Sequence, residues 1–116
     1  NYDAAHVDAA AREIAAAGLA ARIMIDFSHA NSNRDFRRQL DVARDVAAQL
    51  AAGEDRIIGA MVESHLVEGR QNIEPGKPLE RGKSVTDACL GWDDSVALLE
   101  ILAQGVRERR LAVAGR

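Results

Sequence analysis

The sequence has little of what several protein classes depend on. Its 116 residues include one cysteine, Cys89, so no disulfide forms within the chain. Residues 1–3 lack the basic and apolar regions of a signal peptide, which together with the single cysteine favours a reducing compartment, the cytoplasm. No apolar run is long enough to span a bilayer, because Arg12, Glu13 and Arg22 interrupt the alanine-rich start. We therefore expect a cytoplasmic protein without a membrane partner.

The chain also lacks a large excess of charge of either sign. The 15 basic residues face 18 acidic residues, for a net charge of -3. Holding a polyanion by counterion release needs an excess of positive charge, so nucleic acid is not an expected partner. With 47% hydrophobic residues and only two prolines, the chain has material for one modest core. We expect one globular unit over residues 1–116.

Apolar residues recur at helical spacing in three segments. The first runs from Asp3 to Ala17 and stops at Gly18, and the second runs from residue 35 to 52, with Asn33 as its expected N-cap. The third is expected to begin at an Asp93 cap and to fade after residue 110. Its predicted buried face consists of Val96, Leu99, Leu102 and Val106.

Short apolar runs between these helices predict strands. Residues 23–28 and 57–62 are partly β-branched, as expected of strands that are buried on both faces. Residues 84–86 predict a third strand, and residues 69–82 are rich enough in turn residues to predict a long loop. Alternation of helix and strand is typical of α/β proteins with parallel strands.

Each predicted strand ends in polar residues. His29, Glu63 and Asp87 follow the three strands in turn, and the carboxyl ends of parallel strands lie on one face of the fold. An imidazole with two carboxylates is a plausible set of ligands for a divalent cation. Each residue also has an ordinary interpretation, His29 as a hydrogen-bonded loop histidine and the two acids as capping or solvated carboxylates.

Other residues leave alternatives open. Asp26 lies within an apolar strand, where a carboxylate needs a partner, so a structural hydrogen-bonding role and a catalytic role are both possible. His65 is better interpreted as a structural residue than as a ligand. Trp92, just before the expected helix cap, fits a hydrophobic staple. Cys89 fits a small buried residue.

Three segments together resemble a known family, the type I 3-deoxy-D-arabino-heptulosonate-7-phosphate (DAHP) synthases. They are Met24-Ile25-Asp26-Phe27-Ser28-His29-Ala30-Asn31-Ser32, Gly59-Ala60-Met61-Val62-Glu63-Ser64-His65-Leu66-Val67-Glu68-Gly69 and Gly82-Lys83-Ser84-Val85-Thr86-Asp87-Ala88-Cys89-Leu90-Gly91-Trp92. The resemblance implies an α/β fold, the C-terminal portion of a (β/α)8 TIM barrel with strands six to eight and their helices. Residues 1–116 would then be a partial TIM-barrel domain.

The resemblance also implies an activity and a site. DAHP synthases condense phosphoenolpyruvate with erythrose 4-phosphate, releasing phosphate, in the first step of the shikimate pathway to the aromatic amino acids. By this likeness His29, Glu63 and Asp87 would hold a divalent metal ion (Mn, Fe, Co or Zn), and His29 would also be a catalytic residue. Independently, three parallel strands from one side of a barrel leave unpaired edges and uncovered faces, so a homo-oligomer is expected.

The chain lacks other parts of the family pattern. A complete barrel takes about 250 residues, and neither the family's cysteine ligand on strand one nor its Lys-Pro-Arg-Thr segment for the sugar phosphate is present. The chain is therefore expected to be a fragment that is inactive alone, or a truncated gene product. The alternative is a non-catalytic oligomerising or regulatory module derived from the synthase.

Overall fold

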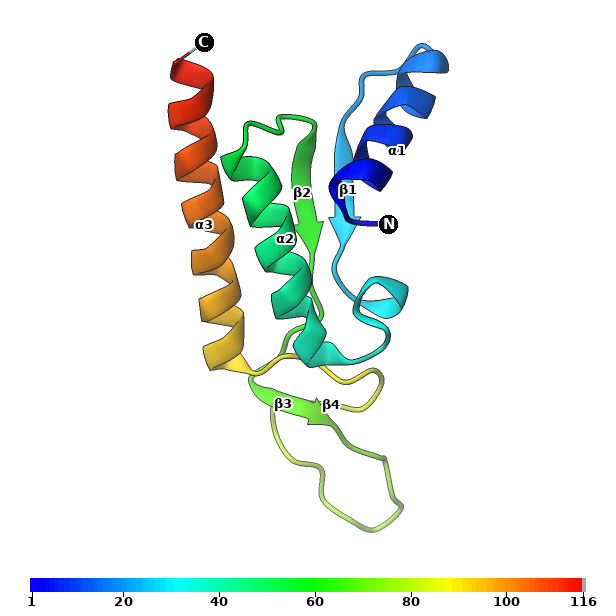
Figure 1. The fold of residues 1–116 in the computed structure, drawn as a ribbon. Coiled ribbons are helices and arrows are strands. Elements are labelled where there is room, and N and C mark those ends of the chain that lie inside the picture. Colours follow the sequence, from blue (N-terminus) through cyan, green and yellow to red (C-terminus); the bar gives the residue numbers. More distant parts are fainter. Residues whose placement is uncertain (116) are drawn as a thin grey trace.

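The computed structural model describes residues 1–115, and helices alternate with strands along the chain (Figure 1). The elements are α1 (Ala4–Ala16), β1 (Ile23–Asp26), the 3-10 helices η1 (His29–Ser32) and η2 (Phe36–Arg38), α2 (Gln39–Ala51), β2 (Ile57–Met61), β3 (Val67–Arg70), β4 (Lys83–Ser84) and α3 (Trp92–Ala114). The predicted mixture of helix and strand is confirmed. Arg116, the last residue of the expected domain, lies outside the described residues.

The strands β1 and β2 pair in parallel, as predicted. Ile25 lies opposite Ala60 and Asp26 opposite Met61, and the amide of Phe27 donates to the Met61 carbonyl at 2.9 Å. Both strands therefore end at the same edge of the sheet. Beyond this edge, an isolated parallel bridge joins Ser64 to Leu90 and brings the segment before α3 beside the end of β2.

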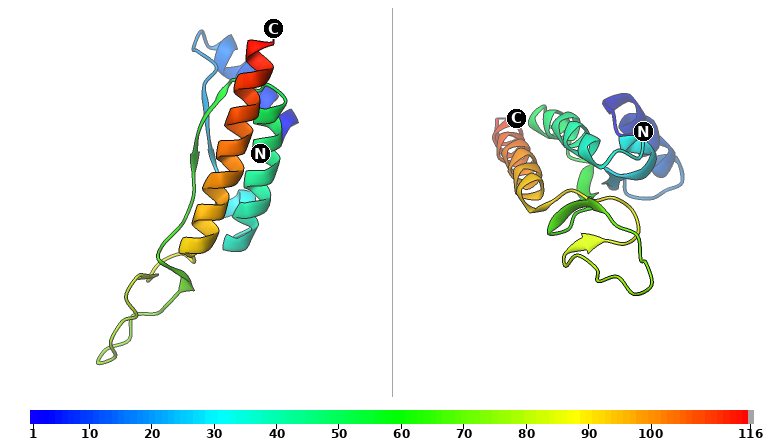
Figure 2. Two further views of the ribbon diagram at one scale, coloured as in Figure 1. Left: turned by 90° about the vertical axis from the view of Figure 1, so that its left-hand side faces the viewer. Right: turned by 90° about the horizontal axis from the view of Figure 1, so that it is seen from below.

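The sheet formed by β1 and β2 is covered on one face. The helices lie on the same side of the two strands (Figure 2), and Ile25 and Ile57 pack into the core beneath them. On the opposite face the side chains of Met24 and Ile58 are 64% and 61% exposed. The prediction of strands buried on both faces is thus wrong for the described residues, because no layer of this chain packs on the second face.

The helices α2 and α3 pack closely at one glycine. A Cβ on Gly105 would come within 2.9 Å of the Ala47 carbonyl oxygen and 3.0 Å of its Cα, so only glycine permits this approach without a shift of backbone. Leu98, about two helical turns before it, is fully buried. The predicted buried face of α3 is wrong at Val96 and Leu99, which are exposed, because the contact is centred on Gly105.

The ends of the last two helices also differ from prediction. The helix α3 begins at Trp92 with Gly91 as its N-cap and continues to Ala114. Trp92 is exposed, so its role as a hydrophobic staple is wrong. Before α2, Asp35 rather than Asn33 caps a helix, since its side chain accepts a hydrogen bond from the Arg37 amide of η2.

The third predicted strand pairs differently from expectation. The strands β3 and β4 form their own two-stranded parallel pair, which extends below the helices in Figure 1. The predicted loop is wrong at residues 69 and 70, which belong to β3, and the predicted strand 84–86 is shifted, because β4 covers Lys83–Ser84. Gln71 ties the rest of this loop together, because its amide donates to the carbonyls of Glu80 and Lys83 and accepts from the Glu80 amide. Within residues 1–115, no helix is long and apolar enough to cross a bilayer.

Candidate metal centre

His29 is fixed in an unusual backbone conformation just after β1. Its φ is 56°, and Asn33 and Arg34 in the same turn have φ values of 52° and 57°. Residues other than glycine rarely adopt this left-handed backbone conformation, and those that do are often found at functional sites. The turn is held by hydrogen bonds, among them Asn31 Nδ2 to the Asp26 carbonyl at 2.8 Å and the Arg34 amide to the His29 carbonyl at 2.9 Å.

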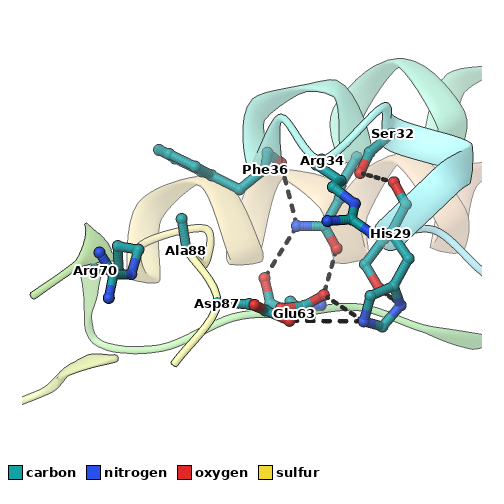
Figure 3. Close-up of a pocket in the computed structure, with 10 residues that line it drawn as sticks. His29, Ser32, Arg34, Phe36, Glu63, Arg70, Asp87 and Ala88 are labelled. Atoms are coloured by element: carbon teal, nitrogen blue, oxygen red, sulfur yellow. Dashed lines mark hydrogen bonds and ion pairs between the residues drawn. The ribbon is translucent and has the colours of Figure 1, made fainter. Parts of the chain in front are cut away.

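The imidazole of His29 connects three carboxylates. Its Nδ1 lies 2.8 Å from Oδ2 of Asp26, and its Nε2 lies 3.3 Å from Oε1 of Glu63 and 3.7 Å from Oδ2 of Asp87. One ligand atom from each of His29, Glu63 and Asp87 lies within 4.8 Å of the others. Figure 3 shows the three side chains converging from separate segments. The structure thus brings together the residues that follow the predicted strands.

Charge at the site is concentrated around this imidazole. The hydrogen bond to Asp26 raises the pKa of His29, and the charges of Asp26, Glu63 and Asp87 add to that effect. Burial works to raise the pKa of Asp26, but hydrogen bonds from Ser28 and His29 outweigh it, so that this pKa lies below its ordinary value. Asp26 therefore stays ionised and favours a proton on His29 Nδ1, which leaves Nε2 directed at the other two carboxylates.

Glu63 is held by a side chain that the sequence did not single out. The Glu63 amide donates to Oε1 of Gln39 at 2.8 Å, and Nε2 of Gln39 donates to the carbonyls of Glu63 at 3.0 Å and Phe36 at 3.1 Å. Gln39 is completely buried. A polar residue on the inward face of a predicted helix was the signal available for it, because a buried amide needs specific partners.

Asp87 reaches the cluster from the segment before α3. Its carbonyl accepts a weak hydrogen bond from the Cys89 thiol at 3.4 Å. Burial raises the pKa of that thiol, and the prediction of Cys89 as a small buried residue is confirmed. His65 takes no part in the cluster of ligand atoms; its Nδ1 accepts a hydrogen bond from the Leu66 amide.

The cluster opens into a cavity of about 380 Å³. Besides the three clustered residues, its walls include Arg34 and Arg70, two cations that the sequence did not single out. The guanidinium of Arg70 is steadied by hydrogen bonds to the Thr86 carbonyl and to Asn72, both 2.8 Å long. The cavity therefore joins a negative cluster to positive groups that suit an anionic ligand.

The donor atoms fit a divalent transition metal ion. Imidazole nitrogen suits Fe, Co and Zn, and carboxylate oxygen also suits Mn. Glu63 and Asp87 lie close enough to repel each other unless a positive group separates them. A cation bound between them would be such a group, and the raised pKa of His29 favours a proton on its ring in the same position.

Known proteins resemble this chain over most of its length. The family described as "DAHP synthetase I family" matches residues 1–100. The Phe-sensitive phospho-2-dehydro-3-deoxyheptonate aldolase of Escherichia coli K12 is 57% identical over 110 residues, which are 95% of this chain and 31% of that protein. The phenylalanine-inhibited aldolase of Saccharomyces cerevisiae is 47% identical over 97% of this chain and 32% of its own length.

A solved structure agrees with these relatives. The phospho-2-dehydro-3-deoxyheptonate aldolase of Francisella tularensis SCHU S4 superposes with a TM-score of 0.89 at 39% identity, over 94% of this chain and 31% of that one. The chain thus spans about a third of the length of the relatives it matches. Since the match of the family covers most of the sequence, the chain belongs to the DAHP synthetase I family.

Proposed function

We propose that this chain is the metal-holding part of a DAHP synthase, which condenses phosphoenolpyruvate with erythrose 4-phosphate and releases phosphate. The observation that carries the proposal is the convergence of His29, Glu63 and Asp87 at one edge of the sheet, in a chain of this family. The relatives are named as phospho-2-dehydro-3-deoxyheptonate aldolases, which is the same reaction class. We assign the three residues as ligands of Mn, Fe, Co or Zn.

The proposed fold is the C-terminal portion of a TIM barrel, over residues 1–116. In this arrangement β1 and β2 are strands six and seven, and the segment around Leu90 that bridges Ser64 belongs to strand eight. The exposed face with Met24 and Ile58 would then face the barrel interior. Its exposure supports a further covering layer, from the rest of a barrel or from another copy in a homo-oligomer.

The proposed mechanism divides the work among residues of the site. Glu63, Asp87 and His29 would hold a divalent ion, which when bound would supply Lewis acidity to stabilise negative charge on the aldehyde oxygen as the carbon–carbon bond forms. His29 would hold that ion through Nε2, while Asp26, 2.8 Å from Nδ1, would keep the ring proton on Nδ1. Both ring nitrogens are thereby engaged, so we assign His29 as a ligand, and its role in proton transfer stays a prediction.

Positive charge near the cluster serves the two phosphorylated substrates. Arg34 and Arg70 line the same cavity as the three proposed ligands. A guanidinium presents several donors to phosphate or carboxylate oxygens. We propose that these two side chains attract the substrates to the cavity and that the main phosphate contacts lie in the part of a synthase that this chain does not span.

Metal titration tests the assignment directly. We expect the chain to bind Mn²⁺ and the variants His29→Ala, Glu63→Gln and Asp87→Asn to lose at least tenfold in affinity, while His65→Ala, in the same region but outside the cluster, keeps it. Equal binding by His29→Ala and His65→Ala would overturn the site.

Phosphate release from the two substrates should be absent with the chain alone, since positioning both of them supplies on the order of 7 kcal/mol or more of barrier lowering.

The second candidate is a non-catalytic module that associates through the exposed sheet face. The observation that favours it is the pair of exposed apolar side chains, Met24 and Ile58, on a face that no element of the described chain covers. Such faces drive association. A chain that self-associates but binds no Mn²⁺ would favour this module over the synthase fragment.

A further inference from the structure

We propose that Gln39 positions Glu63 for metal binding, an assignment that rests on the proposed metal centre. The terminal amide of Gln39 both accepts from the N–H and donates to the C=O of Glu63, at 2.8 and 3.0 Å. Two hydrogen bonds to one residue's peptide groups reproduce the pairing between neighbouring residues in a β-ladder. Gln39 therefore acts as a one-residue strand partner, although it is the first residue of α2.

Glu63 needs such a partner because it lies beyond the end of the ladder between β1 and β2. The ladder between β1 and β2 stops at Met61, whose carbonyl accepts from the Phe27 amide. Two residues later, the Glu63 carbonyl also accepts from the Leu90 amide at 3.0 Å. The backbone of Glu63 is thus joined to α2 on one side and to the segment that carries Asp87 on the other, which fixes the direction of its carboxylate toward His29.

The amide of Gln39 is used completely by this role. Its two N–H groups donate to the carbonyls of Glu63 and Phe36, and its oxygen accepts from Glu63. The side chain is fully buried although it borders the cavity, so the amide is committed to the backbone instead of a ligand. Removing it would leave buried N–H and C=O groups without this partner, which loosens the turn that presents the Glu63 carboxylate.

A second buried glutamine in the same helix supplies a matched control. Gln49 donates from its Nε2 to the Tyr2 carbonyl at 2.8 Å and to Asp45 at 2.7 Å, and it has no contact with the cluster. It is buried to a similar extent as Gln39. Loss of either amide is expected to lower the free energy of unfolding, but only the loss of Gln39 releases Glu63.

The experiment compares Gln39→Met with Gln49→Met, since methionine keeps the length of the side chain without its hydrogen bonds. Mn²⁺ affinity is measured by calorimetry, with folding checked by circular dichroism. We expect Gln39→Met to weaken binding about 10- to 100-fold, as for other residues that orient metal ligands. Gln49→Met should stay within about twofold of the unmodified chain, because its site is remote.

The controls separate two kinds of failure. If the unmodified chain binds no Mn²⁺, the metal centre itself is wrong and the role of Gln39 falls with it. If the unmodified chain binds and folded Gln39→Met binds equally well, the metal centre stands and the positioning role is overturned. Should Gln39→Met not fold, Gln39→Asn takes its place, because it stays neutral and keeps the amide but is one methylene too short to make both hydrogen bonds to the Glu63 backbone. Mn²⁺ affinity unchanged in that variant would likewise overturn the proposal.

Discussion

Asp26 should control how well His29 binds a metal ion. Its Oδ2 lies 2.8 Å from His29 Nδ1, and its Oδ1 accepts from the Ser28 amide at 2.8 Å, so the carboxylate is itself oriented. Partners of this kind keep a ligating histidine in the correct tautomer and make it a stronger donor. Asp26→Ala removes the carboxylate and leaves Nδ1 the weaker, uncharged Ser28 hydroxyl at 2.9 Å, while all three proposed ligands are unchanged.

The size of the effect follows from exposure. Loss of such a partner typically costs 10- to 100-fold in metal affinity, which is about 1.4–2.7 kcal/mol. The side chains of Asp26 and His29 are 42% and 56% exposed, so water competes for the hydrogen bond. We therefore expect the lower end, about tenfold, for Asp26→Ala. A smaller loss is expected for Asp26→Asn, whose amide oxygen still accepts from Nδ1–H.

The assay combines Mn²⁺ titration with nitrogen-15 NMR of the histidine rings. In the unmodified metal-free chain at a pH where His29 is neutral, its proton should reside on Nδ1, and Asp26→Ala should mix the two tautomers. The chain offers a matched control, since Asp3 pairs with Nδ1 of His6 at 2.8 Å with the same sequence spacing but away from the cluster. Asp3→Asn should leave Mn²⁺ affinity unchanged. If Asp26→Ala binds as tightly as Asp3→Asn, the reasoning is refuted.

Three further outcomes are expected. Gly105→Ala should lower the free energy of unfolding by about 1 kcal/mol or more in a denaturant titration, because crowding against the Ala47 backbone outweighs the gain in helix propensity; a more stable variant would contradict this. The hydrogen bond from Arg56 lowers the pKa of Glu54, so its stabilising contribution is full above the ordinary value of 4.5 and is lost as pH falls through the lower folded value. Glu54→Gln should flatten the unfolding free energy against pH in that acid range, and an unchanged slope would count against it. Light scattering at micromolar concentration should show self-association that Met24→Lys reduces, whereas Ile25→Asp should prevent folding, since Ile25 is buried and Met24 is exposed; a folded Ile25→Asp variant or a monomeric parent chain would refute this pair.

Much of the fold was predictable because it depends on local patterns. The strands β1 and β2 follow from short β-branched runs, and their parallel pairing follows from the helix between them. The sequence pattern did not predict which face of a helix or strand packs against its neighbour. Gly105 carries no apolar signal, yet it sets the face on which α3 meets α2, so the buried stripe was placed a residue away at Leu99 instead of Leu98.

The site also has a part that the sequence predicts and a part that it does not. His29 and Glu63 were predictable from their places after β1 and β2, because topology brings parallel strand ends together. Asp87 follows β4, which pairs with β3 instead, so its place in the site rested on the family resemblance. The residues that orient these three side chains were harder to predict from the sequence. Asp26 was noticed as a carboxylate in an apolar run, but Gln39 lies in a helix distant from Glu63 in sequence, and its role depends on a hydrogen-bond geometry that no spacing rule expresses.

Under the proposed function, holding a metal ion and catalysing the condensation make separate demands on the protein. The Glu63 side chain is 19% exposed, whereas that of Asp87 is 71% exposed, so one side of the cluster is enclosed by protein and the other faces water. The convergence of His29, Glu63 and Asp87 depends only on backbone that this chain itself supplies. Electrostatic stabilisation of a developing alkoxide is strong only where water is excluded and donors are preorganised. If the proposed function holds, the exposed side of the cluster and the exposed face of β1 and β2 both need a covering layer, which would exclude water from the proposed metal site.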